Sequence, residues 1–171
     1  MKRKVLALVV AGLLVLVPSA WAYVDSTATQ NSVSGNGTFG SPTNTFRMSF
    51  RASRTDKNAV GNAQIYGSDA QHHLHSFTGF VSCMAVDSTG TNATVLIKIS
   101  DTINEPSNLY GVLIHATDGA SSGADENGSG DALGLVNLNQ SQYNAALTAG
   151  CSPAAGVSPL SSGNITIIKA G

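Results

Sequence analysis

The sequence predicts an all-β protein, a single antiparallel β-sandwich or β-barrel of about seven to nine strands. Apolar and polar residues alternate with a period of two in many short stretches, which is typical of strands with one buried face. Clusters of Gly, Asn, Asp and Ser separate these stretches and indicate turns. Strand patterns do not alternate with helical patterns, so a parallel sheet is disfavoured.

The alternation is clearest around Phe46 and Phe50, which are interleaved with arginine and serine, and around Val95 and Ile97. Residues 137–147 fit either a strand or a short helix, because their pattern does not separate the two. The remaining pattern predicts strands over residues 45–52, 59–66, 73–86, 93–100, 109–116, 132–136 and 163–169.

Residues 1–22 are predicted to be a cleaved signal peptide. Residues 2–4 are all basic, residues 5–17 form an unbroken apolar run of 13, and residues 20–22 (AWA) match a cleavage site. A retained membrane anchor is the alternative, but a spanning helix needs about 20 apolar residues. We therefore expect a secreted or periplasmic protein with no transmembrane segment after signal cleavage.

The rest of the chain is predicted to divide into a flexible N-terminal arm, residues 23–44, and an all-β domain, residues 45–171. The arm is polar and rich in Gly, Ser, Thr and Asn, which is typical of a loop. One short edge strand within it is the alternative. Without the signal peptide the chain carries six basic and ten acidic residues. A slightly acidic surface repels phosphate groups, so nucleic acid is not an expected partner.

The sequence contains two cysteines, Cys83 and Cys151. In an exported protein such a pair predicts one disulfide, with two free thiols or a metal-binding pair as alternatives. The bond would close a loop of almost 70 residues. Because it restricts the unfolded chain, we expect it to stabilise the fold by about 4 kcal/mol.

Several strand and turn segments occur in a characteristic order: TFRMSFRAS, GNAQIYGS, LHSFTGFVSCMAVDSTGTNATVLIKI and PLSSGNITI. In this order they resemble the small secreted bacterial proteins grouped as the post-COAP domain family. The resemblance spans residues 46–169 and implies a secreted all-β domain with no assigned reaction. The residues that carry it are Phe46, Met48, Phe50, Tyr66, His75, Ser76, Cys83, Val86, Ala93, Val95, Asn127, Gly128, Gly130, Asp131, Leu160, Gly163, Asn164 and Ile165.

Three histidines form the first candidate metal site. On a strand, His73 and His75 would lie on one face about 6–7 Å apart, and their imidazoles could bind zinc or copper. His115, on another predicted strand, could supply a third ligand. The alternative is a solvent-facing histidine run at a turn, in which His75 makes a turn hydrogen bond.

The loop 118–131 forms a second candidate metal site, for calcium. Asp125, Asn127 and Asp131 supply oxygen ligands on a glycine-rich backbone, as Ca²⁺ requires. The spacing is not that of an EF-hand, because the closing glutamate is missing. The alternative is a solvated hairpin loop in which Gly and Asn adopt positive φ.

No catalytic residues are predicted. The sequence has no G-x-S-x-G motif, and its two glutamates, Glu105 and Glu126, do not form a recognisable glycosidase pair. We therefore expect a non-enzymatic, exported module that binds an unknown extracellular or envelope partner or has a structural role in the envelope, with no cofactor except possible calcium. The alternative is a barrel that binds a small molecule or a metal through His73, His75 and His115.

Overall fold

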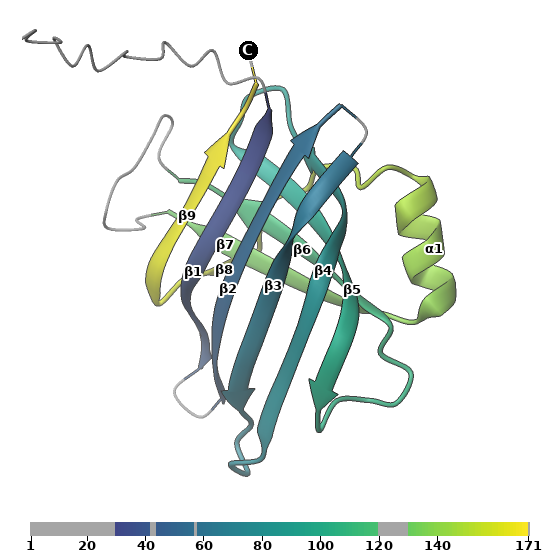
Figure 1. Ribbon diagram of the computed structural model, residues 1–171. Coiled ribbons are helices and arrows are strands. Elements are labelled where there is room, and N and C mark those ends of the chain that lie inside the picture. Colours follow the sequence, from purple (N-terminus) through teal and green to yellow (C-terminus); the bar gives the residue numbers. More distant parts are fainter. Residues whose placement is uncertain (1–29, 42–43, 57, 120–129, 171) are drawn as a thin grey trace, which may run out of the picture.

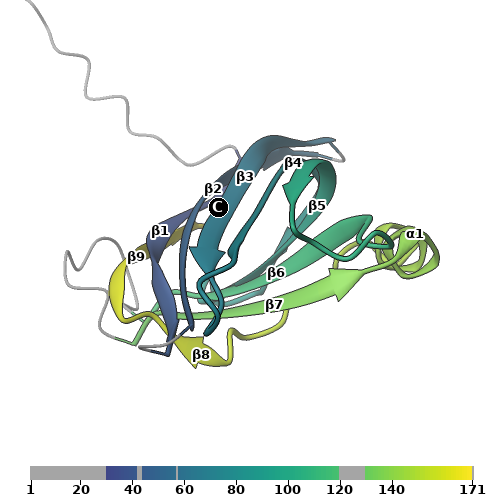
Figure 2. The same ribbon diagram turned by 90° about the horizontal axis from the view of Figure 1, so that it is seen from below.

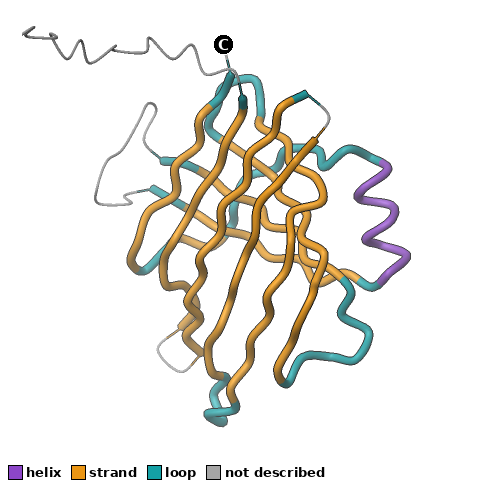
Figure 3. Tube along the Cα trace, in the orientation of Figure 1, coloured by secondary structure: helices purple, strands orange, loops and turns teal. Residues whose placement is uncertain are grey.

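The computed structural model of the chain describes residues 30–41, 44–56, 58–119 and 130–170. Within these residues the chain forms nine strands and a single helix (Figures 1 and 3). The elements are β1 Asn31–Ser41, β2 Asn44–Thr55, β3 Asn58–Ser68, β4 Leu74–Val86, β5 Asn92–Ile103, β6 Gly111–Thr117, β7 Ala132–Leu138, α1 Gln140–Thr148, β8 Ser158–Pro159 and β9 Ser162–Ile168.

All nine strands belong to one antiparallel sheet in the order β8-β7-β6-β5-β4-β3-β2-β1-β9. The sheet curls, so that β6 and β7 face β1 to β4 across a common interior (Figure 2). The predicted all-β antiparallel class is confirmed. The architecture is a half-barrel made from one sheet rather than a sandwich of two sheets.

Apolar side chains from the inner face of every strand from β1 to β7, and of β9, fill the half-barrel. The alternation in β2 turns Phe46, Met48, Phe50 and Ala52 inward, while the arginines between them stay exposed. The fully enclosed centre of this core includes Val33, Met84, Val95, Ile97, Val112, Ile114 and Ile165.

A second, smaller apolar cluster lies on the outer face of the sheet, where α1 packs against β5, β6 and β7. Tyr143 of α1 is buried there, and its hydroxyl donates a hydrogen bond to Ser82 Oγ at 2.5 Å. The predicted disulfide is confirmed: it joins Cys83 of β4 to Cys151, just beyond the helix. The bond therefore ties the segment after α1 to the sheet.

Of the segment 137–147 that fitted either a strand or a helix, the first two residues end β7 and the part from Gln140 onward forms α1. Asn139 caps the helix, because its side chain accepts a hydrogen bond from the Gln142 backbone N–H at 3.0 Å. The Gln142 side chain in turn accepts one from the Asn139 backbone N–H at 2.9 Å. This reciprocal capping box satisfies backbone donors that the first helical turn leaves open.

The prediction of a flexible arm over residues 23–44 is wrong for residues 31–41. Residues 31–41 form a full strand, which pairs with β2 on one side and β9 on the other. Its inner face includes Val33, but glycine stands at Gly35 because the Phe50 ring fills that place. A Cβ on Gly35 would meet Phe50 Cε1 at 2.3 Å.

The strand β9 forms one edge of the sheet, and two buried aspartates serve as its partners there. The Ile165 backbone N–H donates to the Asp131 carboxylate at 2.5 Å, and the Ile167 N–H donates to Asp118 at 3.0 Å. The other Asp131 oxygen accepts from the Gly119 N–H at 2.9 Å. These carboxylates stand where a neighbouring strand would otherwise satisfy the backbone, and they join β9 to the β6–β7 hairpin.

The predicted signal peptide, residues 1–22, lies outside the described residues and stays a prediction. In the part of the chain that the structure describes, no helix has the length and apolar character needed to cross a membrane.

We expect Asp131→Ala to lower the free energy of unfolding by about 2–4 kcal/mol, because two backbone N–H groups lose a charged acceptor in a buried place. Urea unfolding followed by circular dichroism measures this. Asp101→Ala, which removes an exposed carboxylate at the end of β5, is the control and should cost less than about 0.5 kcal/mol. Equal losses in the two variants would contradict the role of Asp131.

Candidate functional site

A pocket of about 530 Å³ opens at the end of the half-barrel where β3 leads into β4. We call it the mouth pocket. Its walls come from both sides of the curled sheet, with β1 to β4 on one side and β7 on the other. The apolar residues that line it are Phe39, Phe46, Ile65, Phe77 and Leu135.

The phenylalanines at the end of β1 and the start of β2 are held by strand pairing. Phe39 and Phe46 lie directly opposite each other in the ladder, and their rings stack with centroids 5.8 Å apart. Aromatic pairs in this arrangement hold a fixed geometry and present a broad apolar surface. One wall of the mouth pocket is therefore pre-formed.

Polar residues gather at the same pocket. The His75 imidazole lies between two carboxylates: its Nε2 is 3.3 Å from Asp69 Oδ2, and its Nδ1 is 3.7 Å from Glu105 Oε1. His73 approaches the same Asp69 oxygen, with its Nδ1 at 3.2 Å. The amides of Asn44 and Asn137 complete the polar lining.

The turn between β3 and β4 fixes Asp69 in this place. Its Oδ1 accepts hydrogen bonds from the backbone N–H groups of Gln71 and His73, both at 2.9 Å. Desolvation favours the neutral carboxyl, but the hydrogen bonds from the His73 backbone and from the His75 and His73 side chains outweigh it. Together they lower the pKa of Asp69 to about 2, so the group is ionised at neutral pH.

The three predicted histidine ligands do not come together. His75 is the second residue of β4 and lies near the end of β5, whereas His115 pairs with Thr94 at the start of β5. His115 also lies on the outer face, where its Nδ1 is 2.8 Å from Thr94 Oγ1 and burial lowers its pKa. Among the described residues, no group of three His, Cys, Asp or Glu side chains is placed to hold a metal ion. The predicted His73–His75–His115 site is therefore wrong.

Of the predicted calcium ligands, Asp125 and Asn127 lie outside the described residues. Asp131 is described, and both of its oxygens accept backbone hydrogen bonds, from Gly119 and Ile165. Asp131 therefore has a structural role at the foot of the loop. Calcium binding by loop 118–131 stays a prediction.

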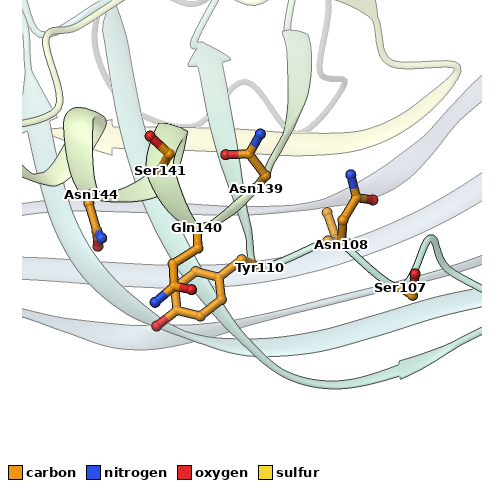
Figure 4. A pocket seen from close by; sticks show the side chains of 8 residues that line it. Ser107, Asn108, Tyr110, Asn139, Gln140, Ser141 and Asn144 are labelled. Atoms are coloured by element: carbon orange, nitrogen blue, oxygen red, sulfur yellow. The ribbon is translucent and has the colours of Figure 1, made fainter.

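A second, more open pocket of about 760 Å³ lies between the β5–β6 loop and the start of α1. Asn108 and Tyr110 line it from the loop, and Gln140 and Asn144 line it from the helix (Figure 4). All eight residues that line it are uncharged. We call this pocket the amide groove, because carboxamide side chains dominate it.

No protein-family model, curated protein or solved structure matches this chain. The resemblance to the post-COAP domain family therefore stays a prediction, as does export.

We expect Asp69→Asn to flatten the acid-induced loss of stability. The pKa of Asp69 is lower in the folded protein than its ordinary value of 3.8, so the ionised carboxylate stabilises the fold at any pH above 3.8. This contribution to the free energy of unfolding is lost as the pH falls to about 2. The difference in melting temperature between wild type and Asp69→Asn should therefore shrink from pH 5 to about pH 2. Thermal unfolding by circular dichroism measures it.

The pKa of Asp87 is also lowered to about 2, but this carboxyl is unchanged in both proteins and cancels in the difference. A difference that stays constant or grows toward pH 2 would contradict the assigned role of Asp69.

Proposed function

We propose that the protein is an exported, non-enzymatic binding module whose half-barrel takes one small, largely apolar molecule in the mouth pocket. The observation that carries the proposal is the composition of that pocket. Five apolar side chains line it, and the polar groups converge around His75. Ligand sites in proteins are typically apolar cavities with a few placed polar groups, and 530 Å³ lies in their usual size range.

The polar groups of the pocket indicate which end group the ligand carries. The Asp69 carboxylate accepts hydrogen bonds, and the Glu105 carboxylate, 3.7 Å from His75 Nδ1, is only 14% exposed. A ligand with an amine or another hydrogen-bond donor would be stabilised beside these carboxylates. A carboxylate or phosphate would be repelled by them. The proposed ligand therefore has an apolar body and a donor or cationic head.

Export is part of the proposal and rests on the predicted signal peptide, residues 1–22. The disulfide between Cys83 and Cys151 supports it, because such bonds persist in oxidising compartments. The module is proposed to act by binding in the cell envelope or outside the cell.

The fluorescent amine N-phenyl-1-naphthylamine tests the proposal, because it is apolar and carries a hydrogen-bond donor. Its fluorescence should rise on binding the purified protein. Asn137→Trp places an indole at the mouth and should weaken binding at least about tenfold, since the ring occupies part of the pocket.

Val136→Trp is the matched control. Val136 directly precedes Asn137 in β7 and points to the outer face, where its side chain is 44% exposed. Binding by this variant should stay within about twofold of wild type. Equal weakening in both variants, or no fluorescence change with wild type, would overturn the proposal.

A further inference from the structure

The outer face of the sheet carries a row of side chains that runs across four strands. Arg51 of β2 lies opposite Asn62 of β3, which lies opposite Phe80 of β4, which lies opposite Lys98 of β5. All four residues are exposed, and Phe80 is 65% exposed although it is a large apolar residue. In the views of Figures 1 and 2, no described element covers β2, β3 or β4 on this side.

The row continues into the amide groove. The Lys98 ammonium lies 5.6 Å from the centroid of the Tyr110 ring, and Tyr110 lines the groove. Beyond Tyr110 the groove presents Gln140 and Asn144 from α1 (Figure 4). The row and the amide groove together form one continuous surface on the outer face, which we call the outer track. It is separate from the mouth pocket, which opens to the inner face.

The cations of the outer track are available to a partner. The ion pairs among the described residues all involve histidine, so neither Arg51 nor Lys98 is paired with a carboxylate there. Arg47, which lies opposite the exposed Tyr66, adds another cation to the same face. Three of the five described Lys and Arg residues therefore share one face of a chain whose formal net charge is −1.

We infer that the outer track binds an acidic polysaccharide, with a sugar ring on Phe80, its carboxylates at Arg51 and Lys98, and its hydroxyl groups at the amide groove. Guanidinium groups pair with carboxylates through two parallel hydrogen bonds. Carboxamides such as Gln140 both donate and accept, as a ring of hydroxyl groups requires. The exposed Phe80 ring supplies a flat apolar surface for the C–H face of a sugar.

The spacing of the cations favours this polymer over a nucleic acid. Arg51 and Lys98 are three strand spacings apart, about 14 Å, and Arg47 and Arg51 are four residues apart along β2, also about 14 Å. Each strand of a nucleic acid duplex carries a charge about every 3.4 Å, and binding proteins match it with dense basic patches. Sparse cations separated by uncharged side chains suit a polymer whose carboxylates are separated by uncharged sugars.

A hyaluronan decasaccharide is the probe, because its carboxylates alternate with uncharged N-acetylated sugars. Calorimetric titration at low salt should show saturable binding to the purified protein. The uncharged N-acetylglucosamine hexamer should bind at least about tenfold more weakly, because it lacks the carboxylates. Arg51→Gln and Lys98→Gln should each weaken hyaluronan binding by about 3- to 10-fold, and Phe80→Ala should do the same.

Two variants serve as matched controls. Lys169→Gln removes the same charge from a side chain whose ammonium contacts Ser88 instead of the outer track. Val157→Ala shortens an apolar side chain that is 82% exposed elsewhere on the surface. Both should bind hyaluronan within about twofold of wild type.

Four results would overturn the inference. The first two are that hyaluronan does not bind and that the uncharged hexamer binds as tightly as hyaluronan. The third is that Lys169→Gln weakens hyaluronan binding as much as Arg51→Gln does. The fourth is that oligothymidylate or phosphatidylglycerol vesicles bind as tightly as hyaluronan, since this would indicate a general polyanion or lipid surface. The variants are exposed surface changes, and circular dichroism checks that each is folded.

Discussion

The half-barrel depends on two buried carboxylates that complete its open side. The strand β9 pairs with β1 along one edge. Along its other edge, without the aspartates, buried backbone N–H groups would have no hydrogen-bond acceptor. Asp118 and Asp131 accept those N–H groups, and they stand at the two ends of the loop between β6 and β7. A tenth strand at this place would form a continuous ladder of hydrogen bonds with β9. The two aspartates instead connect β9 to the loop between β6 and β7, and the sheet stays a half-barrel.

This closure determines what the inner face can hold. Because β9 is drawn toward the β6–β7 hairpin, β7 faces β1 and β2 across the interior, and Leu135 lines the same pocket as Phe39 and Phe46. The disulfide acts on the opposite face, where it ties the segment after α1 to β4. One face of the sheet thus encloses an apolar pocket, and the other carries an amide-rich groove beside α1.

Most of the fold could be predicted from the sequence, because seven strands carry a local pattern. β2 and β5 are the clearest, with inward apolar residues every second position. β1 was not predicted as a full strand, because Gly35 and Gly37 occupy the inward positions between Val33 and Phe39. Its sequence therefore lacks the alternation of apolar and polar residues. Those glycines are explained only by their neighbours across the ladder, which the local sequence does not reveal.

The candidate site could be predicted only in part. His73 and His75 were singled out from their spacing, and both do lie at the mouth pocket or beside it. Asp69 and Glu105 were missed as members of the site, because strand register and the β5–β6 loop bring them to His75. His115 was included wrongly, since the sequence does not say that it faces the outer side of the sheet.

Hydrogen exchange of the β9 backbone amides, followed residue by residue by nuclear magnetic resonance, tests the closure most directly. The neighbouring Thr166 is opposite Ser34 of β1 and serves as the internal reference for a paired strand. If the two aspartates replace a strand partner, the amides of Ile165 and Ile167 will exchange as slowly as that of Thr166. Rapid exchange of Ile165 and Ile167 beside a protected Thr166 would contradict the account.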